Sequence, residues 1–423
     1  MRKESLLILI APNVSEQMGG EAIKALQIFE ELKKLHPNTF QIAHARNRSE
    51  VARLKLEGVS FVDDTWFSML LWRTVVFRGL LEIWYSAKAV KLAEHMVDQL
   101  GSATEAVVIH QTEPNSPVVP RALSKRHVNV FGPINGNIYY PPMFRGRERF
   151  TARVRRLMHM PSQRLNRLLP RGIKCADQIL VAGGERTEVS LKAAGCPQSV
   201  LKESLDCGIR DDFLKRPRVT HQGENLKFVH FGRLVFHKGT SLIIESLPKT
   251  RHAVCLDIVG RGPELQHCRE LVRTLRLEDR VRFLDWYTVQ DDLFRSFPQY
   301  RGVVLPSIED ANGIVIQEAM AMGLPPICLD WGGPSLLIEH GRSGFLIEPV
   351  STAHITTEIA RHMDQLAQDP ELAESISRAA REIAGNWRWS ALATDWLEGY
   401  PVRRSTGREN SDKTSPEPTR CES

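Results

Sequence analysis

The sequence is poor in cysteine and lacks the motifs that cysteine supports. Its 423 residues hold seven cysteines, scattered without a C-x-x-C pair and without the Cys/His spacing of a zinc site. No disulfide framework or structural zinc is therefore expected, and a reducing compartment fits best. A D-x-D motif is also absent, so no essential divalent metal and no other cofactor is indicated.

Long uncharged hydrophobic runs are missing as well. The first residues are short and charged before the apolar run 5–10, so no signal peptide is expected. Residues 66–85 come closest to a membrane span, but two arginines and a glutamate interrupt them. We expect a buried or interfacial amphipathic helix there. A cytoplasmic location follows from these absences.

Charge is present but unevenly distributed. Residues 1–215 carry 31 Lys and Arg against 22 Asp and Glu, a net charge of +9, whereas residues 216–423 carry 25 against 28, a net charge of −3. We expect the basic half to meet an anionic membrane surface or a phosphorylated substrate rather than nucleic acid.

A basic strip, residues 145–174, contributes much of this positive charge. It holds ten basic residues and a single acid, Glu148, with Phe150, Leu157 and Met158 interleaved. Such a strip suits anionic lipid head groups or a lipid diphosphate, and it would hold the protein peripherally on the cytoplasmic face of the membrane. A solvated basic helix is the alternative.

Short apolar runs alternate with longer amphipathic segments in both halves. Strand-helix repetition of this kind needs right-handed crossovers and gives parallel sheets covered on both faces. Ligands then bind at the carboxyl ends of the strands. Strands are predicted at 5–10, 40–43, 59–62, 106–109, 128–131 and 178–181 in the first half, and at 226–231, 255–259, 281–284, 302–305, 326–329 and 344–347 in the second.

A polar segment broken by proline and glycine, residues 215–225, separates the two halves. We therefore predict an α/β protein with an acceptor-side domain over residues 1–215 and a nucleotide-sugar domain over 223–385. A C-terminal helix over 386–400 and a disordered tail over 401–423 would follow.

Two loops of the second half have the composition of a phosphate site. Arg233 and Lys238 lie five residues apart between a strand and a helix, so both can reach one diphosphate. Two solvated surface cations are the alternative. Further along, Gly260 and Gly262 permit close backbone approach, although any tight turn between a strand and a helix has this pattern.

A third loop places Gly313 at the start of a helix, where backbone N–H groups favour an anion. Asp310 and Glu318 lie eight residues apart and can address different parts of one ligand. Asp310 could instead be an N-cap, and Glu318 a solvated helix residue. Glu318, however, precedes an Ala-Met-Ala run, where a lone carboxylate is costly without a partner.

The order and spacing of these motifs resemble the family 4 glycosyltransferases of GT-B fold, including members that assemble polysaccharides. The resemblance covers roughly residues 226–349, and it implies two Rossmann-like domains whose parallel sheets face each other across a cleft. The motifs that carry it are Gly232-Arg233-Leu with Lys238-Gly239, Val259-Gly-Arg-Gly-Pro263, Glu318-Ala-Met-Ala-Met-Gly323, Gly332-Gly333-Pro, and Gly341 followed by Gly344-Phe-Leu.

This resemblance implies a retaining transferase that moves a sugar from a nucleotide-sugar donor to a carbohydrate acceptor. Arg233 and Lys238 would hold the donor diphosphate, and Glu318 would bind the ribose hydroxyls. Gly313 and Ile314 would offer backbone amides to the phosphate or the sugar. Asp310 would contact the donor sugar. The family usually has Glu at that position, so Glu309 could serve instead and the identity of the donor stays open.

The first half would supply the acceptor side. Gly19 and Gly20 resemble the family's paired glycines near the donor phosphates. His110 is the candidate for a histidine that lines the cleft, although Thr112 or Glu113 could occupy that place, and a structural histidine is the alternative. The loop 131–142 resembles an acceptor loop of polysaccharide-assembly members, with a plain tight turn as the alternative.

The sequence therefore predicts a nucleotide-sugar-dependent glycosyltransferase with a carbohydrate acceptor, proposed to be lipid-linked. A GT-B sugar-nucleotide epimerase would use the same fold without an acceptor. A noncatalytic carbohydrate-binding protein is the third possibility, against which the presence of Arg233, Lys238 and Glu318 argues.

Overall fold

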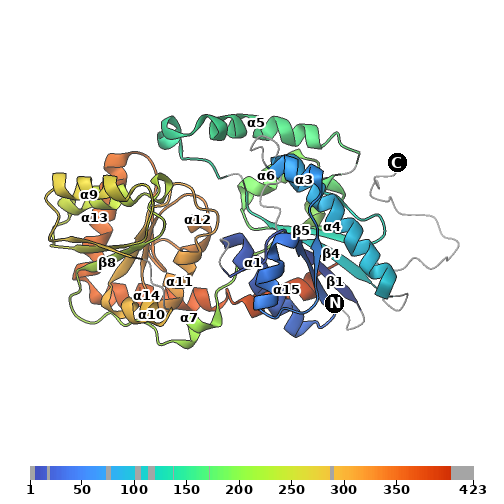
Figure 1. Ribbon diagram of the computed structural model, residues 1–423. Helices are drawn as coiled ribbons and strands as arrows, with labels where there is room; N and C mark the ends of the chain where they lie inside the picture. Colours follow the sequence, from blue (N-terminus) through green and yellow to red (C-terminus); the bar gives the residue numbers. More distant parts are fainter. Residues whose placement is uncertain are drawn as a thin grey trace, which may run out of the picture. The chain divides into compact units, whose positions relative to one another are not determined.

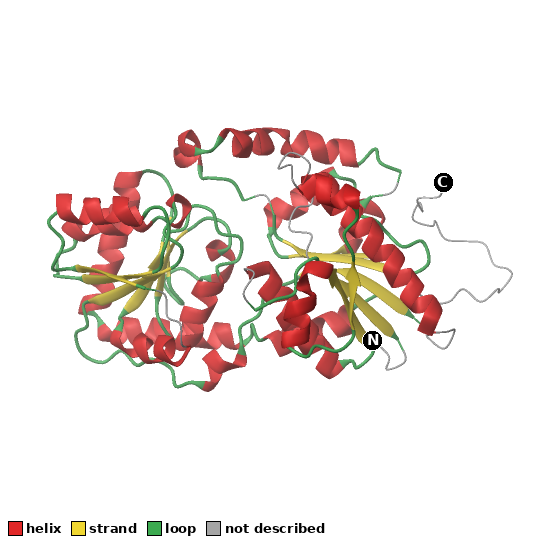
Figure 2. Ribbon diagram, viewed as in Figure 1, coloured by secondary structure: helices red, strands yellow, loops and turns green. Residues whose placement is uncertain are grey.

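A computed structural model describes residues 5–16, 20–72, 78–100, 106–112, 120–136, 138–170, 172–285 and 290–401. The chain forms two compact units, shown in Figures 1 and 2. Unit 1 comprises Met1–Asn137, Arg155–Gly208 and Trp389–Ser423, and unit 2 comprises Ile138–Val154 and Ile209–Arg388. The predicted tail, except for its first residue, lies outside the described residues.

Unit 1 is built on a seven-stranded parallel sheet with the order β3-β2-β1-β4-β5-β6-β7. The strand order reverses between β1 and β4, and a ligand of a parallel sheet binds beside such a reversal. The strands are β1 Leu6–Ile10, β2 Thr39–His44, β3 Val59–Val62, β4 Val107–Gln111, β5 Val128–Ile134, β6 Gln178–Val181 and β7 Leu201–Glu203.

Helices cover both faces of this sheet (Figure 2). Because alternate strand residues point to opposite faces, Ile8 and Ile10 pack with Ala89 and Ala93 of α4 on one face, while Ala43 packs with α1 on the other. The helices are α1 Gly20–Leu35, α2 Arg48–Arg53, α3 Trp66–Trp72, α4 Arg78–Leu100, α6 Glu185–Ala193 and α15 Trp389–Gly399. Helix α5, Phe150–Asn166, begins in unit 2 and belongs to unit 1 from Arg155 onward.

Unit 2 is built on a six-stranded parallel sheet with the order β10-β9-β8-β11-β12-β13. The order reverses between β8 and β11. The strands are β8 Lys227–Phe231, β9 Cys255–Val259, β10 Val281–Leu284, β11 Gly302–Leu305, β12 Pro326–Leu329 and β13 Phe345–Ile347. The helices are α7 Asp211–Lys215, α8 Thr240–Ser246, α9 Leu265–Thr274, α10 Gln290–Ser296, α11 Ile314–Met322, α12 Pro334–Leu337, α13 Thr352–Gln368 and α14 Pro370–Gly385.

The chain passes from unit 1 to unit 2 between Gly208 and Ile209, before the polar segment 215–225. The intervening residues belong to unit 2 because they bond to it. The backbone N–H of Ile209 donates to the carbonyl oxygen of Trp387 at 2.6 Å, and Phe213 is buried. Arg381 of α14 donates to the carbonyl oxygen of Leu214 at 2.7 Å.

Two local expectations differ from the structure. The segment 66–85 forms parts of two helices, α3 and α4, separated by residues 73–77, which lie outside the described residues. Strand β7 was not predicted, because its three residues, Leu-Lys-Glu, show no apolar run. None of the helices in the described residues is long and apolar enough to cross a membrane.

Candidate active site

Two loops of unit 2 meet at the point where its strand order reverses. The β8 loop, residues 232–239, follows β8, and the β11 loop, residues 306–313, follows the adjacent strand β11. The backbone N–H of Ile308 donates to the carbonyl oxygen of His237 at 2.8 Å, and a side chain at Gly239 would overlap the carbonyl oxygen of Pro306. The two loops are therefore packed backbone against backbone.

Asp310 joins the two loops electrostatically. Its Oδ2 lies 2.5 Å from Nζ of Lys238, and its Oδ1 accepts from the backbone N–H of Gly313 at 3.0 Å. Gly313 has a left-handed conformation, φ 69°, and begins α11. The structure thus places one carboxylate against both the lysine and the helix N-terminus that were assigned to phosphate. The N-cap of α11 is Gly313 and not Asp310, so the N-cap alternative for Asp310 is wrong. The ion pair of Asp310 with Lys238 was not predicted from the sequence.

Arg233 lies at the other end of the β8 loop and is exposed. Within the described part of the chain its guanidinium has no hydrogen bond or ion pair. Burial, Lys238 and Arg233 together lower the pKa of His237, while Asp310 opposes them. Both cations therefore act on the same imidazole.

Gly260 and Gly262 support the β8 loop from the neighbouring strand end. A side chain at Gly260 would overlap the carbonyl oxygen of Gly232, and one at Gly262 would overlap that of Leu234. The backbone N–H of Leu234 donates to the carbonyl oxygen of Arg261 at 2.9 Å. This close backbone packing requires glycine at both positions, and it holds the part of the β8 loop that carries Arg233.

Glu318 is a partly buried carboxylate near the middle of α11. No hydrogen bond or ion pair to its side chain occurs among the described residues. Burial raises the pKa of Glu318 to about 7, and Arg210 offsets part of that shift. A carboxylate without donors is ready to accept hydrogen bonds from ligand hydroxyls. The N–H of Ile314, in the first turn of α11, likewise has no partner in the described part of unit 2.

A segment from the first half of the chain covers the β8 loop, and sequence reasoning missed it. The rings of Tyr140 and Phe144 lie 6.0 and 6.2 Å from the ring of Phe236, and the guanidinium of Arg147 lies 5.0 Å from it. Burial and the charge of Glu309 raise the pKa of Tyr140. Tyr140 lies within the loop 131–142, which the sequence assigned to the acceptor, and its contact with the β8 loop was not predicted.

His110 lies in the core of unit 1 with no exposed surface. Its Nε2 lies 2.8 Å from the carbonyl oxygen of Gly132, so this nitrogen carries the proton and donates. Its Nδ1 then accepts from the hydroxyl of Tyr400 at 2.7 Å. Burial lowers the pKa of His110 to about 3. A neutral ring with both nitrogens occupied fits the structural alternative, and this geometry gives the catalytic role no support.

Tyr400→Phe should therefore lower stability by about 1–2 kcal/mol, because it leaves the buried Nδ1 of His110 without its donor. Donor binding should stay within about twofold, since this pair belongs to unit 1 and the β8 and β11 loops belong to unit 2. Urea unfolding and calorimetry measure the two effects. A large loss of turnover at unchanged stability would restore His110 as a catalytic residue.

The remaining acceptor-side candidates are only partly described. Gly20 is exposed and begins α1, whereas Gly19 and Glu113 lie outside the described residues. Thr112 is buried, and its N–H donates to the carbonyl oxygen of Ile10 at 3.0 Å. In the loop 131–142, Asn135 is buried and its side chain hydrogen-bonds to Asp206.

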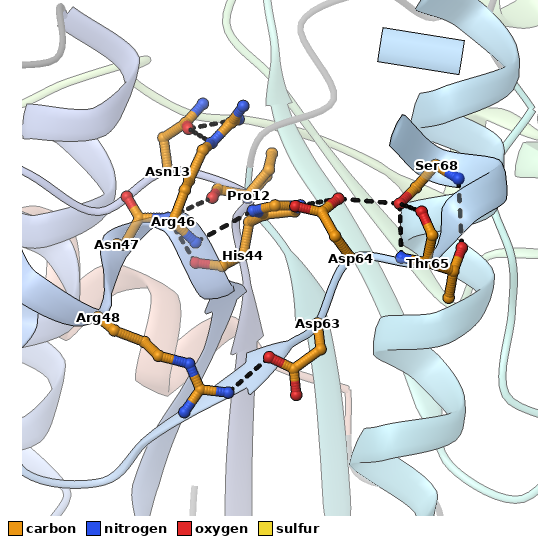
Figure 3. Close-up of polar contacts among 10 residues, drawn as sticks. All are labelled: Pro12, Asn13, His44, Arg46, Asn47, Arg48, Asp63, Asp64, Thr65 and Ser68. Atoms are coloured by element: carbon orange, nitrogen blue, oxygen red, sulfur yellow. Dashed lines mark hydrogen bonds and ion pairs between the residues drawn. The ribbon is translucent and has the colours of Figure 1, made fainter. Parts of the chain in front are cut away.

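Figure 3 shows a polar network at the carboxyl ends of β1, β2 and β3 in unit 1. The guanidinium of Arg46 donates to Oδ1 of Asn13 at 2.7 Å. Nδ1 of His44 accepts from the N–H of Arg46 at 3.2 Å, so Nε2 donates to Oδ1 of Asp64 at 3.2 Å. Asp64 also accepts from Ser68 at 2.8 Å. These side chains hold three loops at the edge where a parallel sheet binds its ligand.

Solved structures share this architecture over nearly the whole chain. The lipopolysaccharide outer core galactosyltransferase WaaB matches with a TM-score of 0.65 and 15% identity, covering 93% of this chain and 98% of that one. HepE of Anabaena, solved in complex with UDP, matches with a TM-score of 0.63 and 18% identity, with the same coverage. The likeness confirms the predicted fold, GT-B with two Rossmann-like domains.

The sequence of unit 2 is similar to that of a known protein family. Residues 211–383 match the family model described as glycosyl transferases group 1. This region contains the β8 loop, the β11 loop and α11. This part of the chain is therefore similar to the group 1 glycosyl transferases, and the resemblance to family 4 is confirmed.

Curated relatives match this chain over less than half of its length. The GDP-mannose-dependent α-(1-6)-phosphatidylinositol monomannoside mannosyltransferase of Mycobacterium tuberculosis is 30% identical over 214 residues, which are 47% of this chain and 53% of that protein. The N-acetyl-α-D-glucosaminyl L-malate synthase of Bacillus anthracis is 37% identical over 125 residues, 30% of this chain and 31% of that protein. The matches thus span about half of these relatives' length or less.

Proposed function

We propose that the protein is a retaining glycosyltransferase that takes a sugar from a nucleoside-diphosphate sugar and places it on a carbohydrate acceptor. The observation that carries the proposal is that Asp310 links Lys238 to the N-terminus of α11 where the strand order of unit 2 reverses, with Arg233 on the same loop as Lys238. Two cations and a helix N-terminus form a site for an anion of high charge. A diphosphate supplies that charge.

The chemistry expected of this site is stabilisation of the leaving group. As the bond from the anomeric carbon to the diphosphate oxygen breaks, its electron pair goes to the diphosphate. Arg233 and Lys238 stabilise the charge that develops there. With retention, the acceptor hydroxyl forms its bond on the face that the diphosphate leaves, and its proton passes to a departing phosphate oxygen. Glu318 holds the ribose, since its carboxylate has no donor within the described part of unit 2.

Asp310 is assigned to the donor sugar. Asp310→Asn keeps a side-chain oxygen that can accept from the N–H of Gly313 but removes the charge that neutralises Lys238. We expect affinity for the bare nucleoside diphosphate to be unchanged or higher, and turnover to fall at least about tenfold. Calorimetry measures the affinity for the nucleoside diphosphate, and initial rates measure the turnover. A parallel loss of affinity for the bare nucleotide would place Asp310 at the phosphates, and Glu309→Gln tests the neighbouring carboxylate in the same assays.

The acceptor is proposed to be lipid-linked, with the protein working peripherally at an anionic membrane surface. The basic excess of residues 1–215 and the basic strip 145–174 support this part of the proposal. A lipid-linked sugar at that surface would be presented beside the positive half of the chain. The expected result is faster transfer to acceptor presented in anionic vesicles than in neutral ones.

The donor is tested by measuring the melting temperature with a panel of nucleotide sugars. A ligand that binds only the folded state raises the transition in proportion to its affinity. We expect one nucleotide sugar to give the largest shift, and Glu318→Gln to reduce it. No shift with any member of the panel would favour the noncatalytic alternative. Conversion of the donor without acceptor would favour the epimerase.

A further inference from the structure

Helix α5 has its apolar side chains on the outside. Phe150, Leu157, Met158, Leu165 and Leu168, the last just after the helix, are between 53% and 78% exposed. Intervals of seven or eight residues separate Phe150, the adjacent pair Leu157 and Met158, and Leu165, and Leu168 follows three residues later, so all five lie on a single stripe along the helix. A helix on the surface of a globular unit ordinarily turns such a stripe toward the core, so this orientation requires a reason.

The inward face of α5 is polar and firmly bonded. Nε2 of His159 lies 2.8 Å from Oγ of Ser190 in α6, and Nε2 of Gln163 donates to the same oxygen at 2.7 Å. Gln163 has no exposed surface. Burying these groups is tolerable only because they hydrogen-bond. The two contacts fix the rotation of the helix, and the outward apolar stripe follows from that rotation.

The charges on α5 indicate what covers the stripe. The helix contains no Asp or Glu, and Arg153, Arg155 and Arg164 are exposed beside the apolar residues. Arg167 follows directly and is also exposed. An apolar stripe bordered by arginines matches the boundary between anionic head groups and acyl chains. A protein partner would have to supply an apolar groove with an acidic rim, whereas an anionic bilayer offers both features at once.

We propose that α5 lies in the plane of an anionic bilayer, with its apolar stripe at the head-group and acyl boundary and its arginines at the lipid phosphates. This inference deepens the proposed membrane location and rests on that part of the proposed function, not on the donor chemistry. It adds a hydrophobic component to an attachment that charge alone would leave sensitive to salt.

The test is cosedimentation with vesicles of phosphatidylcholine, alone or mixed in equal parts with phosphatidylglycerol, at low and high salt. Leu157→Gln/Leu165→Gln should lower partitioning onto the mixed vesicles at least about tenfold at both salt levels, which corresponds to about 1.4 kcal/mol. Arg153→Gln/Arg155→Gln/Arg164→Gln should remove the salt-sensitive part of the binding. The matched control is Leu35→Gln/Leu100→Gln, which changes two equally exposed leucines of unit 1 on α1 and α4 and should bind as the unmodified protein does.

Three results would overturn the inference. The first is unmodified binding by Leu157→Gln/Leu165→Gln. The second is loss of binding only when Trp66 and Leu70 are replaced, because α3 also carries exposed apolar side chains. The third is a dimer of the unmodified protein that Leu157→Gln/Leu165→Gln dissociates, together with no vesicle binding, which would assign the stripe to a second copy.

Absence of vesicle binding by the unmodified protein would also remove the membrane location from the proposed function. A preserved melting shift with a nucleotide sugar would show that the donor assignment still holds.

Discussion

Lys238→Ala and Arg233→Ala should each lower turnover at least about a hundredfold while the fold stays intact, on the scale of losing one preorganised electrostatic group. Lys238 is assigned to charge that develops on the leaving diphosphate, so its loss should act mainly on kcat. The fold should survive because the Asp310 carboxylate keeps its hydrogen bond to the N–H of Gly313 without the lysine. Arg233 is exposed, and its removal breaks no hydrogen bond or ion pair in the described structure.

Initial rates at saturating donor, with circular dichroism and melting curves, provide the measurement. Arg273→Ala is the matched control, because it removes an exposed arginine of the same unit on α9. Near-normal turnover in either Arg233→Ala or Lys238→Ala would remove that residue from the phosphate site. A loss of turnover matched by unfolding would show that the residue acts through stability.

Glu318→Gln should make the protein more stable at pH 8 and weaken its binding of donor. Burial raises the pKa of Glu318 to about 7 in the folded chain, above its ordinary value of 4.5. The folded state therefore favours the protonated form, and the ionised form above pH 7 costs stability on the order of 3 kcal/mol. The neutral amide avoids this cost. The stability difference between the two proteins should shrink as the pH falls from 7 toward 4.5.

Donor binding should respond in the opposite direction. If ribose hydroxyls donate to the ionised carboxylate, Glu318→Gln loses hydrogen bonds to a charged group, roughly a tenfold to hundredfold loss of affinity. The affinity of the unmodified protein should fall as the pH drops from 8 to 6, and that of the variant should stay flat. A nucleotide sugar is the suitable probe, because its diphosphate is a diester that does not titrate in this range.

Melting curves across pH and calorimetry measure both sides of this prediction. Glu278→Gln is the control, since it neutralises an exposed glutamate of the same unit. Equal donor affinity in Glu318→Gln and the control would refute the ribose assignment. Lower stability of Glu318→Gln at pH 8 would show that Glu318 has a partner in solution.

The strands of both sheets were predictable because buried parallel strands consist of continuous apolar residues. Predicted and observed ends of β3, β6, β9, β10, β11 and β12 coincide. The packing of the β8 loop against the β11 loop was predictable for the same reason, since loops that follow such strands collect at one edge of the sheet. Glu318 was singled out by the Ala-Met-Ala run after it. In the described part of the structure its side chain has no hydrogen bond or ion pair.

The contacts that involve distant parts of the chain were not predictable. His110 is separated by 290 residues from Tyr400, whose hydroxyl occupies one of its ring nitrogens. The sequence of the strip 145–174 revealed a mixture of basic and apolar residues, but not which of them face outward. Which face of α5 points outward depends on the contacts of His159 and Gln163 with Ser190, which periodicity does not reveal.

The reaction proposed for this protein is transfer of a sugar from a nucleotide-sugar donor to an acceptor hydroxyl. The most direct measurement is NMR of the reaction of the best-binding nucleotide sugar with a panel of carbohydrate and lipid-linked acceptors. We predict release of nucleoside diphosphate that depends on acceptor, with a product whose anomeric configuration equals that of the donor. Conversion of the donor without acceptor, or a product of inverted configuration, would contradict the proposed reaction.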